Sequence, residues 1–408
     1  MRLTVPSYSK LATFTLLICA LCGGFFFLTG SHIPKYVVLV LCFLTILASY
    51  IVHKAPDLNS YTRSYIEFFT PWAPWYFSVI VLVLFFDGVP ESSEFFNALL
   101  IMFLIFGALY PQHFERKKVI TYLAISLLIV SLAIDFQILT YGFSSGGSSV
   151  IGTNKNKVLG ITSALTLCCF GTLLFEGHKY NQRIKLLLIA SVVASLSSII
   201  LAQVRTGILP FLALIPFVCY LKRDNKKVVA CAILVPFFLL AMSFVTGRMQ
   251  QGFADLQQYQ TGVVYTSWGL RLELWKLAIN AFEDAPIFGW GKEPYEAMVA
   301  AGHTIGIPNF TKLYHFHNDF FNALTAGGLF EVICWFSTLF LMARKSRNDP
   351  ASLCLLLGVL SAGLVERYWF HRITLFAFVT LWTLLYISNS QFWPGKKQLD
   401  HKEEVPKS

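Results

Sequence analysis

Apolar runs of about 16 to 24 residues recur along the whole of this 408-residue chain. A helix needs roughly 20 such residues to cross the hydrocarbon core of a bilayer, and within lipid the backbone must satisfy its own hydrogen bonds. Transmembrane β-strands would instead give segments of about 10 residues with strict alternation, and the sequence shows none. The runs therefore predict an all-α polytopic membrane protein.

Twelve spans are expected, and one connection between them is much longer than the rest. The expected spans are residues 11–29, 36–52, 71–86, 96–111, 118–140, 158–176, 186–203, 207–221, 228–246, 320–342, 351–366 and 373–389. The chain then divides into nine transmembrane helices over 1–246, a large loop over 247–319, three helices over 320–389 and a tail over 390–408.

Basic residues indicate how the spans are oriented. Only 13% of the residues are charged, against about 25% in ordinary soluble domains. The net charge of +10 is therefore better explained by loops that orient membrane helices than by nucleic-acid binding. Most of the 32 lysines and arginines fall on the side of the N-terminus. We expect both termini to be cytoplasmic and residues 247–319 to face the other side.

The large loop carries a second, amphipathic pattern. Loops of this length are usually functional or disordered, and the stretch "WGLRLELWKLAINAFEDAPIFGWGKEPY" is not of low complexity. It predicts a helix near the membrane surface, followed by a glycine-rich turn. The apolar residues at helical spacing are Leu270, Leu274, Leu277, Ala278 and Phe282.

Two arginines on this side are candidates for an anion site. Arg205 stands in "LAQVRTGILP", in a short turn between two spans, and Arg271 begins the predicted loop helix. Arg205 also fits a side chain that anchors the interface, and Arg271 also fits a solvated helix face. If the two converge, their guanidinium groups suit phosphate oxygens.

The stretch "YHFHND", residues 314–319, places two histidines before an apolar span. His315 and His317 would point to different faces of a helix, and Asp319 adds little, so a shared metal site is not expected. A histidine here fits an aromatic interface anchor, and it also fits a general base because imidazole titrates near neutral pH.

The last turn on this side, "ERYWFHRITL", adds Glu366, Arg367, His371 and Arg372. These residues fit an interfacial belt of aromatic and basic side chains. They also map to the same face as the arginines and histidines described above. A basic, aromatic-lined cavity on that face would suit a phosphate-bearing lipid and a sugar.

Taken in order, these pieces resemble the O-antigen ligase family, within the wider ligase and polymerase superfamily of membrane glycosyltransferases. The matching pieces are "VRTG" at 204–207, "RLELW" at 271–275 leading to "PIFGWG" at 286–291, and His317-Asn318 followed after nine residues by Gly328. The sequence departs just afterwards, where "LFEV" stands in place of a further small residue. The layout of about twelve spans and one large loop also matches, which implies a GT-C-like fold.

The resemblance implies a reaction and a role for each candidate. A polysaccharide on undecaprenyl diphosphate would pass to a sugar hydroxyl of lipid A–core oligosaccharide at the periplasmic face of the inner membrane, with no metal, nucleotide or other cofactor. Arg205 and Arg271 would hold the diphosphate, and His317 would be the base in an inverting displacement. The further candidates are His315, Asn318, Arg367, His371 and Arg372.

Three other functions stay open. An O-antigen polymerase performs the same chemistry on a second lipid-linked glycan. A protein O-oligosaccharyltransferase uses a Ser or Thr hydroxyl, but its members usually carry a larger C-terminal periplasmic part. A transporter of lipid-linked glycans would typically show repeated halves and broken helices with a site at mid-membrane. The sequence shows no such repeat.

Overall fold

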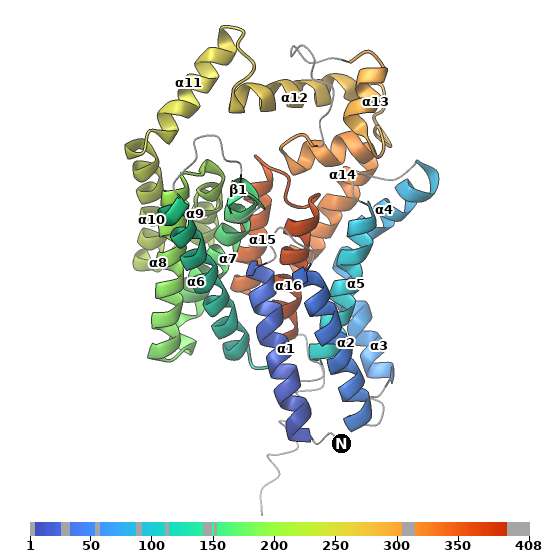
Figure 1. Ribbon diagram of the computed structural model, residues 1–408, viewed down its shortest axis with the longest axis vertical. Helices are drawn as coiled ribbons and strands as arrows, with labels where there is room; N and C mark the ends of the chain where they lie inside the picture. The colour runs from blue at the N-terminus through green and yellow to red at the C-terminus, as the bar shows by residue number, and fades with distance from the viewer. Residues whose placement is uncertain are drawn as a thin grey trace, which may run out of the picture.

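A computed structural model describes residues 5–25, 33–53, 58–86, 92–110, 114–141, 149–150, 153–303 and 315–389. These residues form a bundle of helices, and β1 (Ser149–Val150) and β2 (Thr153–Asn154) add a short antiparallel pair. Figure 1 shows α11, α12 and α13 lying across one end of the bundle, which is called the loop end here.

The helices follow the apolar pattern. In chain order they are α1 (Val5–Phe25), α2 (Ile33–His53), α3 (Leu58–Phe69), η1 (Thr70–Trp72), α4 (Ala73–Phe85), α5 (Ser92–Leu109), α6 (Arg116–Tyr141), α7 (Lys155–Glu176), η3 (Gly177–Lys179), α8 (Gln182–Ala202), η4 (Arg205–Gly207), α9 (Leu209–Leu221), α10 (Lys226–Val245), α11 (Arg248–Gln260), α12 (Ser267–Phe282), α13 (Pro294–Ala300), α14 (Asp319–Lys345), α15 (Pro350–Gly363) and α16 (Arg372–Ile387).

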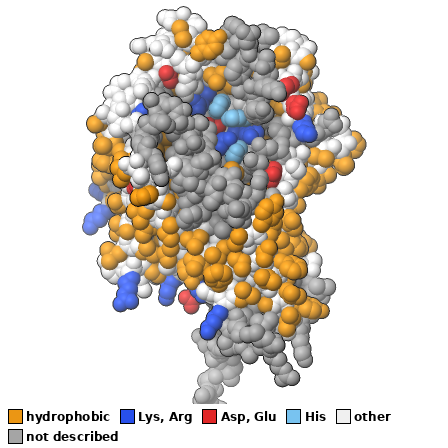
Figure 2. Space-filling model, in the orientation of Figure 1, with side chains coloured by type: hydrophobic (Ala, Val, Ile, Leu, Met, Phe, Trp, Pro, Cys, Tyr) orange, Lys and Arg blue, Asp and Glu red, His pale blue; other side chains and the backbone are white. Residues whose placement is uncertain are grey.

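Seven of the described helical segments are long and apolar enough to cross a membrane, and five shorter apolar helices accompany them. Large apolar side chains face outward on many of these helices, for example Leu139 and Phe85, which are 73% and 74% exposed. Figure 2 shows this apolar surface as a broad belt. Such a belt suits lipid rather than water. The predicted all-α polytopic membrane fold is confirmed.

The predicted amphipathic helix in the large loop is present as α12. Leu274, Leu277 and Ala278 are buried there. They pack in a small core of their own with Tyr295 and Met298 from α13. The predicted glycine-rich turn follows, with positive φ at Gly289 and Gly291.

That turn repairs a break in α14. Gly328 has φ 62° and ψ −156° inside the helix, so helical hydrogen bonds are lost around it. The segment 286–291 replaces them. Trp290 and Gly291 donate to the carbonyls of Thr325 and Ala326 at 2.7 and 2.9 Å. The amides of Leu329 and Phe330 donate to Pro286 and Ile287 at 2.9 and 3.0 Å. A broken span needs such partners, because lipid offers none.

An aromatic cluster supports the connection between α15 and α16 from below. The ring of Trp369 lies 5.5 Å from Trp72 and 5.3 Å from Trp75, measured between centroids. Phe378 lies 5.2 Å away on α16. All four side chains are buried. The connection 364–371 is therefore packed against the core rather than free in solvent.

Replacing Gly328 with alanine is expected to destabilise the protein. An added Cβ would lie 2.5 Å from the backbone of Ile287 and 2.7 Å from the amide nitrogen of Gly289. A left-handed non-glycine residue also costs about 1–2 kcal/mol. We expect a lower Tm and less monodisperse protein in detergent, measured by fluorescence-detected size exclusion after heating.

Two glycines serve as matched controls. Gly262→Ala keeps a positive φ of 89° but meets nothing within 4 Å, and Gly177→Ala meets nothing and has no positive φ. The expected order of Tm is Gly177→Ala, then Gly262→Ala, then Gly328→Ala as the lowest. Equal values for Gly262→Ala and Gly328→Ala would show that the docked turn contributes nothing.

Candidate functional site

The start of α14 presents the two histidines. Asn318 is the N-cap: its Oδ1 accepts the amides of Phe320 and Phe321 at 2.8 and 3.2 Å. Helix capping by Asn fixes where a helix begins, so His317 lies just outside α14 with a left-handed φ of 51°. Histidine is one of the few residues enriched in that conformation.

Side chains from α14 and α12 hold the segment that carries His317. Asn322 donates to the carbonyl of Asn318 at 2.6 Å and accepts the amide of Phe316 at 3.0 Å. From the loop, the indole of Trp275 donates to the carbonyl of Phe316 at 2.9 Å. Phe316 is 1% exposed. The backbone of 316–318 is thereby fixed to α14 and to α12.

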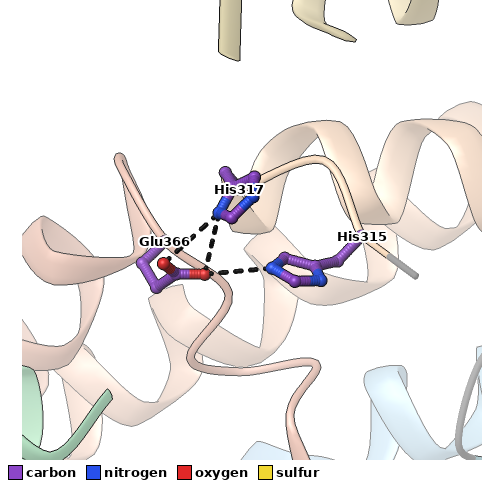
Figure 3. A group of neighbouring side chains, drawn as sticks. All are labelled: His315, His317 and Glu366. Carbon is purple, nitrogen blue, oxygen red and sulfur yellow. Dashed lines mark hydrogen bonds and ion pairs between the residues drawn. The ribbon is translucent and has the colours of Figure 1, made fainter. Parts of the chain in front are cut away.

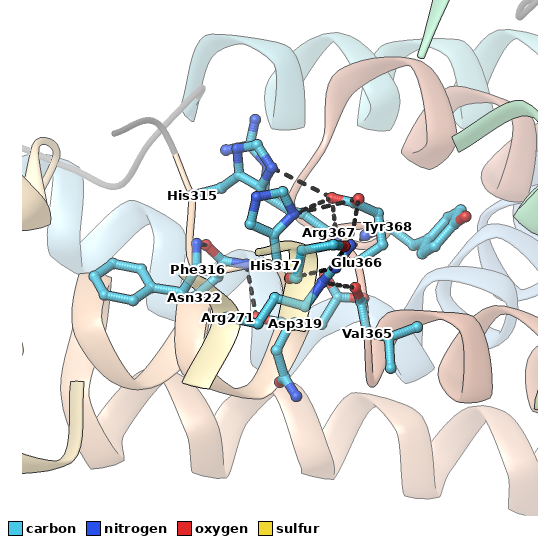
Figure 4. Close-up of polar contacts among 12 residues, drawn as sticks. Arg271, His315, Phe316, His317, Asp319, Asn322, Val365, Glu366, Arg367 and Tyr368 are labelled. Carbon is cyan, nitrogen blue, oxygen red and sulfur yellow. Dashed lines mark hydrogen bonds and ion pairs between the residues drawn. The ribbon is translucent and has the colours of Figure 1, made fainter. Parts of the chain in front are cut away.

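The connection between α15 and α16 is clamped against the same helix start. Asn318 Nδ2 donates to the carbonyl of Leu364 at 2.8 Å. Asp319, which is 2% exposed, accepts the amides of Tyr368 at 2.9 Å and Trp369 at 3.0 and 3.1 Å. These bonds join residues that are about 50 positions apart in the sequence. They bring residue 366 beside His317 (Figure 4).

The carboxylate of Glu366 contacts both histidines, as Figure 3 shows. Its Oε1 lies 3.2 Å from Nδ1 of His317 and 3.3 Å from Nε2 of His315. The Arg367 amide donates to the same carboxylate at 3.1 Å. The Glu366 side chain is 1% exposed, while the histidines keep about a fifth of their surface. Glu366 is the hub of the site.

Burial and contacts act in opposite directions on these groups. Burial raises the pKa of the Glu366 carboxyl, but hydrogen bonds from His315 and His317 outweigh it and hold that pKa well below its ordinary value. Burial lowers the pKa of His315 to about 4, although Glu366 opposes the shift. At neutral pH Glu366 is therefore ionised and His315 is neutral.

The ionised carboxylate sets the tautomer of His317. A carboxylate only accepts hydrogen bonds, so Nδ1 of His317 must carry the proton in the 3.2 Å contact. Nε2 is then left with its lone pair and is able to take a proton. The same logic orients the histidine of catalytic triads. His315, with a pKa of about 4, is a weak proton acceptor.

Arg271 approaches the hub from α12. Its Nε donates to the carbonyl of Val365 at 3.2 Å, and its Nη1 donates to the carbonyl and hydroxyl of Ser267 at 2.9 and 2.6 Å. Its Nη2 lies 3.9 Å from Glu366 Oε2. The guanidinium is thus held firmly along one edge, and its contact with Glu366 is long.

A cavity of about 690 Å³ opens beside Arg271. Leu209, Leu212 and Leu240 of α9 and α10 line its apolar part, while Arg248 and Arg271 line its polar part. Val204 and Thr206 belong to the same lining. The cavity thus joins apolar faces of two membrane helices to two guanidinium groups.

For two further candidate arginines, Arg205 and Arg372, the structure describes only the backbone. Arg205 begins η4, between two residues that line the cavity, and Arg372 begins α16. Both side chains lie outside the part of the chain that the structure describes. The convergence of Arg205 with Arg271 stays a prediction.

The prediction that His315 and His317 point to different faces is wrong. His315 and His317 precede the helix, so their rings lie 4.2 Å apart instead of on different faces. With Glu366 they bring three potential metal-ligand atoms within 4.8 Å of one another. Two histidines and one carboxylate suit a divalent metal by count. However, the guanidinium of Arg271 and the charge of Arg367 act on the same group and oppose a second cation.

The other two candidates from the last turn are buried at the site. Arg367 and His371 are 4% and 9% exposed, which is deeper than an interfacial belt requires. Burial lowers the pKa of His371 well below its ordinary value, and the charges of Lys157 and Arg367 add to this. His371 is therefore neutral at neutral pH.

The sequence did not assign a role to Glu366, although it lies in the stretch that drew attention. Its partner His317 is 49 residues away, so no local spacing joins them. The available signal was an acidic residue among bases at an apolar boundary, since such a residue is expensive unless it is paired.

Two comparisons with known proteins bear on identity. A family model described as O-Antigen ligase matches residues 190–336. The chain is 24% identical over 311 residues to a protein named O-antigen ligase from Escherichia coli (strain K12), covering 70% of this chain and 71% of that protein. The matched range contains η4, α12, the docked turn and the His317 segment. The resemblance seen in the motifs is thereby confirmed: residues 190–336 match the O-Antigen ligase family model, and the chain is similar to an O-antigen ligase over most of its length.

Proposed function

We propose that this protein transfers a polysaccharide from undecaprenyl diphosphate to a sugar hydroxyl of lipid A–core oligosaccharide. The observation that carries the proposal is the pairing of His317 with the ionised Glu366 at 3.2 Å, beside a guanidinium that lines a partly apolar cavity. The similarity to O-antigen ligases suggests the class of donor and acceptor.

His317 acts as the base in this proposal. As the acceptor hydroxyl attacks the anomeric carbon, its proton passes to Nε2 of His317, and the bond from that carbon to the phosphate oxygen breaks. Attack opposite the leaving group inverts the anomeric centre. Glu366 keeps Nδ1 protonated and stabilises the imidazolium that forms.

Arg271 holds the leaving diphosphate in this proposal. Charge builds on the phosphate oxygens as the bond breaks, and a positioned guanidinium stabilises it. The polyprenyl chain lies along the apolar residues of α9 and α10 in the cavity. Arg205 joins Arg271 on the diphosphate.

The reaction takes place at the periplasmic face of the inner membrane, with both termini in the cytoplasm. A deletion strain separates the ligase from its relatives. Loss of the polymer ladder from lipid A–core, while polymer accumulates on its lipid carrier, is expected for a ligase. A single-repeat product on the core would instead identify a polymerase.

His317→Ala is expected to lower the transfer rate by about 10²–10⁴-fold, the usual contribution of a positioned base. His317→Gln keeps a hydrogen bond without a proton acceptor and fails similarly. Glu366→Gln should lose a similar amount, because an amide no longer fixes the tautomer of His317. The assay uses purified protein, lipid-linked donor and rough lipopolysaccharide.

Two controls make that experiment decisive. His315→Ala is expected to lose much less than His317→Ala, because its pKa of about 4 makes it a weak base. A chelator in the assay should leave the wild-type rate unchanged. A wild-type transfer rate in His317→Ala would show that His317 is not the base. Loss of activity with chelator, restored by zinc, would show that His315, His317 and Glu366 bind a metal ion.

Arg271→Ala is expected to raise the KM for the lipid-linked donor and to lower kcat, while Arg271→Lys is intermediate. Lysine keeps the charge but loses the planar fork that contacts Ser267 and a phosphate together. Lys276→Ala, an exposed position on the same helix, is the matched control. A donor KM equal to wild type in Arg271→Ala would contradict the role.

The proposed orientation is checked by labelling cysteines in a cysteine-free background. Gln260→Cys at the end of α11 and Asp224→Cys between α9 and α10 are both exposed. An impermeant thiol reagent, applied to cells with only the outer membrane permeabilised, should label position 260 and not 224. The reverse result would invert the topology.

A further inference from the structure

A pocket of about 540 Å³ lies at the C-terminal end of α14, next to α3 and far from the candidate site. Figure 1 shows α3 at the opposite end of the bundle from α11, α12 and α13. Glu67, Thr70 and Pro71 form one wall of the pocket, and the end of α14 forms the other. Lys345 ties the walls together, because its Nζ lies 4.0 Å from Glu67 and 5.8 Å from the ring centroid of Tyr386.

Two arginines, Arg344 and Arg347, line the α14 side of this pocket, and both are exposed. The carboxylates near them are bonded to other cations. Glu67 pairs with an arginine one turn earlier on α3, at 3.3 Å. Asp349 is 3% exposed and pairs with Arg116. The two exposed guanidinium groups are therefore suited to an anion that enters the pocket from outside, and guanidinium groups bind phosphate well.

An apolar row on the surface of α14 leads directly to these arginines. Leu329, Ile333, Phe336 and Phe340 are all exposed. They recur every three or four residues, so they lie along one side of the helix, and Arg344 is the next position of the same row. From Leu329 to Phe340 the row rises about 17 Å at 1.5 Å per residue. This length is close to half of the roughly 30 Å hydrocarbon core, which is the apolar depth of one leaflet.

The position of the pocket matches the headgroup region of that leaflet. Figure 2 shows Lys and Arg side chains along the edge of the apolar belt away from the loop end. Basic residues at such an edge orient the helices of a membrane protein, but orientation requires neither a second wall nor a pocket. Anionic lipids are bound by basic pockets between helices at the membrane surface. The apolar row and the two arginines together fit the two parts of one such lipid.

We propose that this pocket binds an anionic phospholipid, with Arg344 and Arg347 on its phosphate and an acyl chain along the row from Leu329 to Phe340. Both substrates of the proposed reaction meet at the loop end, so this lipid is neither donor nor acceptor. By holding the C-terminal end of α14 at a fixed depth, it steadies the helix whose other end carries the candidate site. The inference does not depend on the proposed function.

The test is native mass spectrometry of the full chain with two defined lipids, phosphatidylglycerol and phosphatidylcholine. Both carry a phosphate, but only the first has a net charge. Wild-type protein should bind phosphatidylglycerol about tenfold more tightly, as expected for two basic residues near the membrane surface. Replacing Arg344 and Arg347 together with glutamine should abolish this preference, and replacing both with lysine should keep part of it.

A matched double variant controls for the loss of two surface charges. Arg183→Gln combined with Arg223→Gln removes two exposed arginines at the same end of the bundle, and it should keep the preference for phosphatidylglycerol. The Tm in phosphatidylcholine nanodiscs should be the same for every variant, because the substituted side chains are exposed. Added phosphatidylglycerol should then raise the Tm of the wild type and of the control, and not that of the double glutamine variant at the pocket.

The apolar row and the source of the phosphate are tested separately. Phe340→Ala should weaken phosphatidylglycerol binding, while Phe238→Ala, an exposed position on α10, should not. Glycerol 1-phosphate should fail to displace the lipid, because it has no acyl chain; displacement would identify a site for soluble phosphates and overturn the lipid. The inference is also overturned if wild type binds both lipids equally, if the double glutamine variant at the pocket keeps the preference, or if the control loses it as well.

Discussion

The geometry of the site depends on the hydrogen bonds that Asp319 accepts from the amides of Tyr368 and Trp369. A carboxylate at the first position of a helix is favoured by the helix dipole, and here it also binds a second segment. Together with the bond from Asn318 to Leu364, it fixes where the connection 364–371 lies. Glu366 reaches His317 only because this connection is held.

A second constraint acts nine residues later on the same helix. The break at Gly328 frees backbone groups that lipid cannot satisfy, and the turn 286–291 supplies their partners. The turn is the continuation of α12, which carries Arg271. Both ends of the segment 319–328 therefore contact pieces of chain that bear candidate site residues, Glu366 and Arg271. The nine residues between Asn318 and Gly328 therefore separate the place where the connection 364–371 binds α14 from the place where the turn 286–291 binds it.

Much of this arrangement follows from sequence. The apolar runs predicted the helices, and five apolar residues at helical spacing predicted α12. The start of α14 could also have been predicted from the sequence, because Asn before an apolar run is a common N-cap. Treating 315 and 317 as helical missed this signal and led to the wrong conclusion that their rings diverge. Asn318, a secondary candidate, is the N-cap of α14, so both histidines lie outside the helix.

Contacts between segments that are distant in the sequence could not be predicted in the same way. Glu366 pairs with His317 across 49 residues, and Arg271 reaches Val365 across 94. Such pairings depend on how α12, α14 and the last connection pack, which no local pattern encodes. The sequence did show that polar groups collect on one face. It did not show that one carboxylate would be shared among them.

Sharing one carboxylate has a consequence for the proposed chemistry. When His317 takes the proton, it becomes an imidazolium beside Glu366, so the new positive charge is neutralised where it forms. In the proposed reaction the negative charge grows instead on the diphosphate, near Arg271. Because Nη2 of Arg271 is 3.9 Å from Glu366 and most of its bonds go to Ser267 and Val365, the guanidinium is held without being neutralised. It therefore keeps its charge for the leaving group, while Glu366 keeps its charge for the base.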